Sequence, residues 1–215
     1  MPKNIQIAVV GSGYVGLVAA VCFAEMGHDV ICVDNDERKV AALQGGDTLI
    51  HENYLPELLQ RYRNTKVRFM TDLAEATREC EAIFIAVGTP QSETGDADLS
   101  YVEAVACEIA RSITSYKVIV EKSTVPVYTN EWIRRAIERN GVARDLFDVV
   151  SNPEFLREGT AVADFLHPDR IVVGADSERA AAVLNGIYAP LTGGSYYERA
   201  DAIPALADPS QTHLS

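Results

Sequence analysis

The chain has 215 residues, of which 47% are hydrophobic and 23% are charged, and this composition is typical of a globular protein rather than a disordered chain or a coiled coil. Its formal net charge of -12 argues against general binding to nucleic acids or anionic membranes, because its field repels both. The sequence contains neither an apolar run long enough to span a bilayer nor a signal peptide, so we expect a soluble, cytoplasmic protein.

The predicted elements alternate between strands and helices. Apolar runs predict strands at 5–10, 29–33, 67–70, 82–87, 117–121, 147–150 and 170–173. Helical spacing predicts helices at 15–26, 37–43, 54–62, 73–80, 99–111, 128–139 and 178–187, and a polar loop is expected at 91–98. This order favours an α/β fold with a doubly wound, mostly parallel sheet in three α/β/α layers, Rossmann-like in type. We expect this domain to cover residues 1–190 and an irregular tail to cover 191–215.

The carboxyl ends of the predicted strands all carry residues that suit ligand binding. These ends are Gly11, Asp34, residues 87–90, Ser123-Thr124 and residues 152–154. Since parallel strands connected by right-handed crossovers end at one edge of the sheet, we expect these loops to form one cleft. The four cysteines (Cys22, Cys32, Cys80 and Cys107) lack metal-ligand spacing and are expected to be small buried hydrophobes, so no metal site is predicted.

A glycine-rich turn follows the first strand. Gly11, Gly13 and Gly16 match the GxGxxG pattern, and an acidic residue, Asp34, ends the next strand 18 positions after Gly16. We expect Gly11 to allow a tight turn, Gly13 to let a pyrophosphate approach, and Gly16 to let the helix pack closely on the strand. The sequence therefore predicts a dinucleotide site at the N-terminus of this helix.

Asp34 is expected to accept hydrogen bonds from the adenosine ribose. Its carboxylate would repel a 2′-phosphate, which favours NAD over NADP. Lys39 is expected to lie over the adenosine or in solvent.

Two further segments offer polar side chains at the same edge. Ser123 and Thr124 either bind a ligand or water or else cap the next helix, and the pattern leaves both interpretations open. Residues 151–159 place Glu154, Arg157 and Glu158 in one loop, and a charged cluster at 164–170 follows. His167, in that cluster, is either a titratable group or a structural one.

In these segments the chain resembles the nucleotide-sugar 6-dehydrogenases. The resemblance is carried by residues 11–17, 22–28, 32–34, 84–90, 123–126, 152–159 and 164–170. Residues 158–159 and 164–170 fit the UDP-glucose branch of the family better than the GDP-mannose or N-acetylmannosamine branches. The resemblance implies two NAD-dependent oxidations of a sugar C6 alcohol to a carboxylate, through an enzyme-bound thioester, with UDP-glucose as substrate.

The resemblance also implies roles for single residues. Glu154 would be the catalytic acid/base, and Thr124 would help to hold the catalytic water. The UDP-sugar would contact Glu154, Phe155, Leu156, Arg157 and Glu158. The cofactor would contact Gly11, Gly13, Tyr14, Val15, Gly16, Asp34, Lys39, Thr89, Thr124 and Glu158.

The family's nucleophilic cysteine, and its catalytic lysine and asparagine on a central helix that builds the usual homodimer, have no counterpart in these residues. We therefore expect a truncated chain that cannot complete the oxidation alone. The alternatives are a non-catalytic NAD-binding module, a partner of a full-length subunit, a GDP-mannose 6-dehydrogenase relative, and a different Rossmann-type dehydrogenase, the last disfavoured by residues 152–159.

Overall fold

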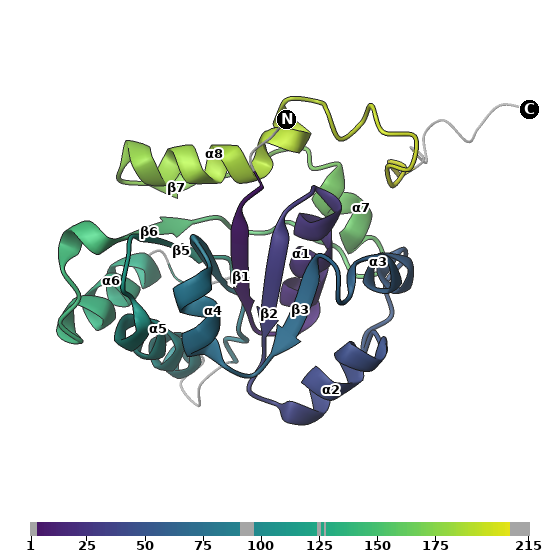
Figure 1. The fold of residues 1–215 in the computed structure, drawn as a ribbon. Coiled ribbons are helices and arrows are strands. Elements are labelled where there is room, and N and C mark those ends of the chain that lie inside the picture. Colours follow the sequence, from purple (N-terminus) through teal and green to yellow (C-terminus); the bar gives the residue numbers. More distant parts are fainter. Residues whose placement is uncertain (1–3, 91–96, 124–125, 127, 207–215) are drawn as a thin grey trace, which may run out of the picture.

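The computed structural model describes residues 4–90, 97–123, 126 and 128–206. They form a seven-stranded sheet with helices on both faces (Figure 1). The strands are β1 (Gln6–Val10), β2 (Asp29–Val33), β3 (Val67–Met70), β4 (Ala82–Ile85), β5 (Lys117–Glu121), β6 (Phe147–Ser151) and β7 (Gly174–Ala175). The helices are α1 (Tyr14–Glu25), α2 (Glu37–Gly45), α3 (Leu55–Tyr62), α4 (Leu73–Glu79), α5 (Ser100–Ser112), α6 (Thr129–Arg139), α7 (Ala161–Leu166) and α8 (Glu178–Thr192), with a 3-10 turn at Arg144–Leu146.

The strand order is β3-β2-β1-β4-β5-β6-β7, and β1 to β6 run parallel. Most of their residues are buried, as expected for parallel strands covered on both faces. This arrangement confirms the predicted Rossmann-like α/β fold. From β1 the chain turns to β2 on one side, and it later crosses to β4 on the other side. The loops after β1 and β4 therefore diverge, which creates the crevice in which ligands of such sheets bind.

The sheet separates two hydrophobic cores because successive side chains of each strand point to opposite faces. On β1, Ile7 and Val9 pack in the core under α1, α2, α3, α7 and α8, whereas Ala8 and Val10 pack under α4, α5 and α6. Helix α1 is almost wholly buried; its Phe23 ring lies 4.7 Å from Phe84 of β4 and 5.2 Å from Phe165 of α7. These contacts hold α1 against the sheet.

For residues 160–175 one prediction is wrong and one helix was missed. The predicted strand at 170–173 is absent, and the edge strand is β7, which runs antiparallel to β6. Asn152 Nδ2 donates 2.8 Å to the Val172 carbonyl, so a side chain takes the backbone group that a strand would use. The sequence interpretation also missed α7, whose six residues are too few to show a helical period.

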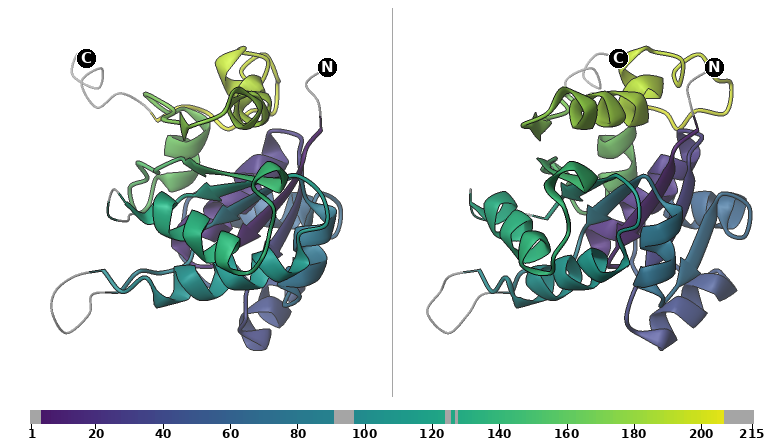
Figure 2. Two further views of the ribbon diagram at one scale, coloured as in Figure 1. Left: turned by 90° about the vertical axis from the view of Figure 1, so that its left-hand side faces the viewer. Right: turned by 60° about the vertical axis from the view of Figure 1, so that its left-hand side comes forward.

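Helix α8 extends to Thr192, and the segment 193–206 follows it near α7 (Figure 2). This segment packs on the core: Tyr196 is only 1% exposed, and Arg199 pairs with the buried Glu25 of α1 at 3.0 Å. The predicted division at residue 190 stays a prediction. In the part of the chain that the structure describes, no helix is long and apolar enough to cross a membrane.

Candidate functional site

In the glycine turn between β1 and α1, backbone conformation and close backbone contacts require glycine at two positions. Gly11 has a φ of 101°, and a Cβ there would lie 2.7 Å from the Ala86 carbonyl oxygen. A Cβ on Gly16 would lie 1.8 Å from the Gly11 carbonyl oxygen. The tight turn and the close helix packing predicted for these two residues are therefore confirmed as geometry.

Gly13 differs from the other two glycines of the turn. Its φ of -70° is open to any residue, and a Cβ there would meet no described atom within 4 Å. Gly13 is the N-cap of α1, and no described side chain caps the amides of the first turn. These amides and the helix dipole favour an anion. The turn thus leaves room for a phosphate where the helix attracts one, so its residues fit the pyrophosphate of a dinucleotide.

Asp34 lies beside this turn, at the end of β2. Its Oδ2 accepts hydrogen bonds from the Ser12 amide (2.8 Å) and hydroxyl (2.6 Å), and its Oδ1 accepts one from the Asp36 amide (3.0 Å). Burial alone would raise the pKa of Asp34, but these hydrogen bonds and the charge of Lys39 outweigh it and lower the pKa. Asp34 is therefore an ionised acceptor, and the two carboxylate oxygens keep capacity for ribose hydroxyls.

The structure describes some of the other predicted cofactor residues and not others. Val15 is half-buried in the first turn of α1, Thr89 is half-buried after β4, and Lys39 is exposed near the start of α2. Thr124 lies outside the described residues, as does most of the predicted loop 91–98. Ser123 Oγ donates 2.9 Å to the Val87 carbonyl, joining the ends of β5 and β4. Helix α6 begins after Tyr128, so the capping interpretation is wrong for Ser123.

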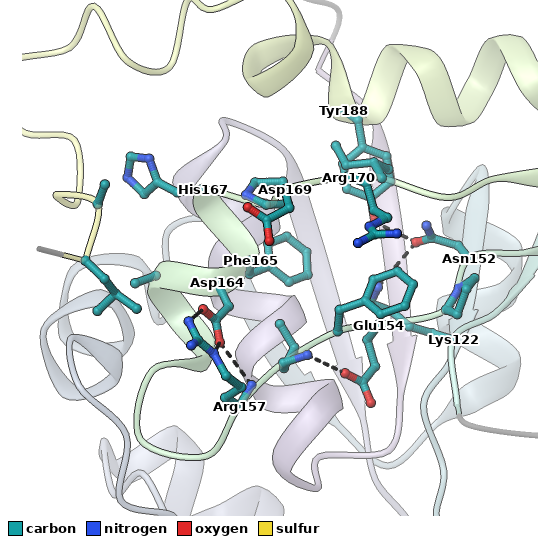
Figure 3. Close-up of a pocket in the computed structure, with 18 residues that line it drawn as sticks. Lys122, Asn152, Glu154, Arg157, Asp164, Phe165, His167, Asp169, Arg170 and Tyr188 are labelled. Atoms are coloured by element: carbon teal, nitrogen blue, oxygen red, sulfur yellow. Dashed lines mark hydrogen bonds and ion pairs between the residues drawn. The ribbon is translucent and has the colours of Figure 1, made fainter. Parts of the chain in front are cut away.

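A cavity of about 590 Å³ lies beyond the end of β6, beside α7 and α8 (Figure 3). Four of the five predicted substrate residues line it: Glu154, Phe155, Leu156 and Arg157. Other lining side chains include Lys122, Asn152, Asp164, His167, Arg170 and Tyr188. The cofactor-side glycines and Asp34 do not line this cavity. Glu158 also lies outside the lining, and its charge acts on the Tyr14 hydroxyl.

Two charged side chains of the loop 154–158, Glu154 and Arg157, make hydrogen bonds that hold the loop in place. Glu154 Oε2 accepts a 2.7 Å hydrogen bond from the Leu156 amide (Figure 3). The Arg157 guanidinium donates to both oxygens of Asp164, at 2.6 and 3.1 Å, so a predicted substrate residue is already oriented by α7. Phe155 is 58% exposed, with the Arg170 guanidinium 5.9 Å from its ring centre.

Lys122 is a cavity residue to which the sequence analysis gave no role. The residue is 3% exposed, its Nζ lies 3.3 Å from Asn152 Oδ1, and it lies 5.3 Å from the centre of the Phe165 ring. Burial lowers the pKa of Lys122 to about 8, although the charge of Glu154 opposes the shift. The Tyr188 hydroxyl donates 2.6 Å to the same Asn152 oxygen. A lysine directly after a buried strand is the signal that could have revealed it.

His167 has a structural environment. Its Nε2 lies 2.6 Å from the Ile203 carbonyl oxygen, and its ring lies 5.1 Å from that of Tyr197. Among the described residues no group of three or more His, Cys, Asp or Glu side chains could hold a metal.

The glycine turn and the cavity loop meet at Tyr14. Its hydroxyl lies 3.2 Å from the Arg157 carbonyl oxygen and donates a hydrogen bond to Glu52, a residue that the sequence analysis missed. Burial is the largest cause that raises the pKa of Tyr14, and this hydrogen bond is the next. The hydroxyl therefore stays a neutral donor. One side of the loop 154–158 thus lines the cavity, and the other side contacts the dinucleotide turn.

The comparisons with known proteins agree with this geometry. Residues 5–192 match the model of the UDP-glucose/GDP-mannose dehydrogenase family, NAD binding domain. The chain is 46% identical over 186 residues to UDP-glucose 6-dehydrogenase TuaD of Bacillus subtilis, covering 86% of this chain and 40% of that protein. It is 48% identical over 191 residues to UDP-glucose 6-dehydrogenase of Rhizobium meliloti, covering 87% and 44%.

A solved UDP-glucose dehydrogenase from the archaeon Pyrobaculum islandicum has the same fold, with a TM-score of 0.84 and 42% identity, covering 88% of this chain and 45% of that one. The chain thus spans less than half the length of each relative. The domain's cofactor is NAD, as predicted. The chain belongs to the UDP-glucose/GDP-mannose dehydrogenase family, and its residues 5–192 match the family's NAD-binding domain.

Proposed function

We propose that this chain is the NAD-binding part of a UDP-glucose 6-dehydrogenase, which oxidises the C6 alcohol of UDP-glucose to the carboxylate of UDP-glucuronate in two steps. The observation that carries this proposal is the contact of the loop 154–158 with both the cavity and Tyr14 of the glycine turn. A sugar nucleotide in the cavity would thereby lie beside the cofactor. The names of the relatives support UDP-glucose as the substrate.

Each half of the site has a distinct task in this proposal. Gly11, Gly13 and Gly16 shape the pyrophosphate seat, and Asp34 binds the ribose, while NAD supplies the hydride acceptor when bound. Tyr14, Val15, Lys39, Thr89, Thr124 and Glu158 are proposed as further cofactor contacts. Phe155, Leu156, Arg157 and Glu158 are proposed to contact the sugar nucleotide.

Glu154 is proposed as the acid/base, with Thr124 holding the catalytic water. The Leu156 amide fixes one oxygen of the Glu154 carboxylate at 2.7 Å, so the other oxygen can exchange a proton with a substrate or a water in the cavity. Lys122, which is buried and lines the same cavity, interacts electrostatically with Glu154.

Calorimetry on the purified chain tests the proposal, with NAD, UDP-glucose and GDP-mannose as separate ligands. We expect NAD and UDP-glucose to bind, and GDP-mannose to bind at least about tenfold more weakly, a difference of about 1.4 kcal/mol. Preference for GDP-mannose would contradict the choice of sugar nucleotide. Binding of NAD without either sugar nucleotide would support a non-catalytic NAD-binding module instead.

A further inference from the structure

Glu52, in the connection between α2 and α3, is a buried carboxylate that bonds to two functional segments. It is 7% exposed. Its Oε2 accepts hydrogen bonds from the Tyr14 hydroxyl and from the Gly159 amide (2.9 Å), and its Oε1 accepts one from the Ala161 amide (2.8 Å). One side chain therefore joins the start of α1 to the segment between the cavity loop and α7.

The neighbouring residue strengthens the same junction. Asn53 Nδ2 donates 2.7 Å to the Gly159 carbonyl, so residues 52 and 53 hold Gly159 through both its amide and its carbonyl. Gly159 has a φ of 85°, a conformation that L side chains rarely adopt, and it directly follows the predicted substrate residues 154–158. The position of the loop 154–158 relative to the glycine turn therefore depends on residues that belong to neither.

All three partners of Glu52 are donors, so its function requires a carboxylate. A glutamine would place its NH₂ group against at least one N–H or O–H donor, leaving that donor unpaired in a buried place. Tyr14 is the only one of the three partners that belongs to the glycine turn. Any restriction of Tyr14 by a bound dinucleotide would reach the Gly159 and Ala161 amides through the Glu52 carboxylate.

We propose that Glu52 is a positioning residue that transmits cofactor binding at the glycine turn to the segment 157–161. This inference rests on the proposed function. It predicts that NAD orders the loop of the sugar-nucleotide cavity although the cavity lining contains no glycine of the turn. The coupling is reciprocal, so an ordered loop would in turn favour NAD.

Amide hydrogen exchange of the purified chain, with and without saturating NAD, tests this inference. In the unmodified chain we expect NAD to slow exchange of the amides of residues 157–161 by about fivefold or more. In Glu52→Gln, NAD should still bind, but this slowing should be lost. Tyr14→Phe removes the hydroxyl that donates a hydrogen bond to Glu52 and that also lies 3.2 Å from the Arg157 carbonyl oxygen. At saturating NAD this variant should reduce the slowing as well, and it serves if Glu52→Gln does not fold.

Glu25→Gln is the matched control. Glu25 is also a buried carboxylate, 1% exposed, and it accepts a hydrogen bond from a tyrosine, Tyr62, at 2.7 Å, but it lies at the far end of α1. This variant should lose stability like Glu52→Gln and keep the NAD-dependent slowing. If NAD binds the unmodified chain without slowing exchange in residues 157–161, or if Glu52→Gln keeps the slowing, the inference is wrong while the proposed function stands. If NAD does not bind the unmodified chain, both fail.

Discussion

The Ser12 hydroxyl, inside the glycine turn, donates a 2.6 Å hydrogen bond to Asp34 Oδ2, at the end of the neighbouring strand. This bond, with that of the Ser12 amide, joins the predicted pyrophosphate site to the predicted ribose acceptor. The two parts of the cofactor site are therefore positioned relative to each other by the fold itself. Such preorganisation lowers the entropic cost of binding.

Asp34→Ala should weaken NAD binding by about 10- to 100-fold, because charge-assisted hydrogen bonds contribute about 1.5–3 kcal/mol. It should also reduce the preference for NAD over NADP, since the carboxylate that repels a 2′-phosphate is gone. Calorimetry with both dinucleotides measures the two effects. Asp72→Ala, which removes an N-cap at α4, is the control and should lower stability without changing NAD affinity. Unchanged NAD binding in Asp34→Ala would refute the role of Asp34.

The chain's own cysteines should not form a thioester with the sugar. Burial raises the pKa of Cys32 and of Cys80 to about 12 and raises that of Cys22 well above its ordinary value, whereas a nucleophilic cysteine needs an accessible thiolate. Cys107, half-buried in α5, lies on the opposite face of the sheet from the core that contains α7. Mass spectrometry of the purified chain with NAD and UDP-glucose should detect neither UDP-glucuronate nor a covalent adduct, and detecting either would contradict this account.

The sequence was sufficient for the parts of the molecule that depend on local pattern. Apolar strands predicted the sheet, and the spacing of Gly11, Gly13, Gly16 and Asp34 predicted the dinucleotide turn. The sequence could not reveal contacts between distant segments, and Glu52 reaches Gly159 and Ala161 across more than 100 positions. The edge strand was misplaced because the Asn152 side chain occupies the Val172 carbonyl, a contact without a local signature. The homodimer expected from the resemblance stays a prediction.

His28 should make the protein sensitive to acid. Its Nδ1 accepts from the Ile5 amide at 3.3 Å and its Nε2 lies 2.8 Å from the Ile187 carbonyl oxygen, which suits the neutral ring with a proton on Nε2. Burial lowers the pKa of His28, although the hydrogen bond to Ile187 opposes the shift. As the pH falls, the unfolded chain therefore binds the extra proton before the folded protein does. The contribution of neutral His28 to the free energy of unfolding is complete above about pH 6.5 and is lost as the pH falls through the folded-state pKa.

Urea unfolding at pH 7.5 and 5.5 measures this loss. His28→Asn should lower the free energy of unfolding at pH 7.5 by about 1–2 kcal/mol, since one buried hydrogen bond disappears, and should show a smaller loss on acidification. His51→Asn, at an exposed histidine, should behave like the unmodified chain. An unchanged pH dependence in His28→Asn would rule out this explanation.

Glu121, at the end of β5, should make stability depend on pH in the direction opposite to that of His28. Burial raises the pKa of Glu121 to about 8, and its Oε1 has no hydrogen-bond partner among the described residues. The folded protein therefore retains a proton that the unfolded chain releases, and stability is lost as the pH rises from about 4.5 through about 8. Glu121→Gln should be more stable than the unmodified chain at pH 8 by about 1–3 kcal/mol, because the neutral amide avoids the cost of keeping the carboxyl protonated at this pH.

The same comparison at pH 5.5 should give a much smaller difference, and Glu108→Gln, at an exposed position of α5, should give none at either pH. Urea unfolding again provides the measurement. A Glu121→Gln variant that is less stable than the unmodified chain at pH 8 would mean that the ionised carboxylate stabilises the fold.

Calorimetric titration of Gly13→Val with NAD tests the central claim, because Gly13 is the turn glycine that neither backbone conformation nor packing explains. A side chain there would point into the space assigned to the pyrophosphate. We predict unfolding within about 1 kcal/mol of the unmodified chain, since only the identity of an N-cap changes, and NAD affinity reduced at least about 100-fold. NAD binding of equal strength in the two proteins, or none in the unmodified chain, would contradict a dinucleotide site at this turn.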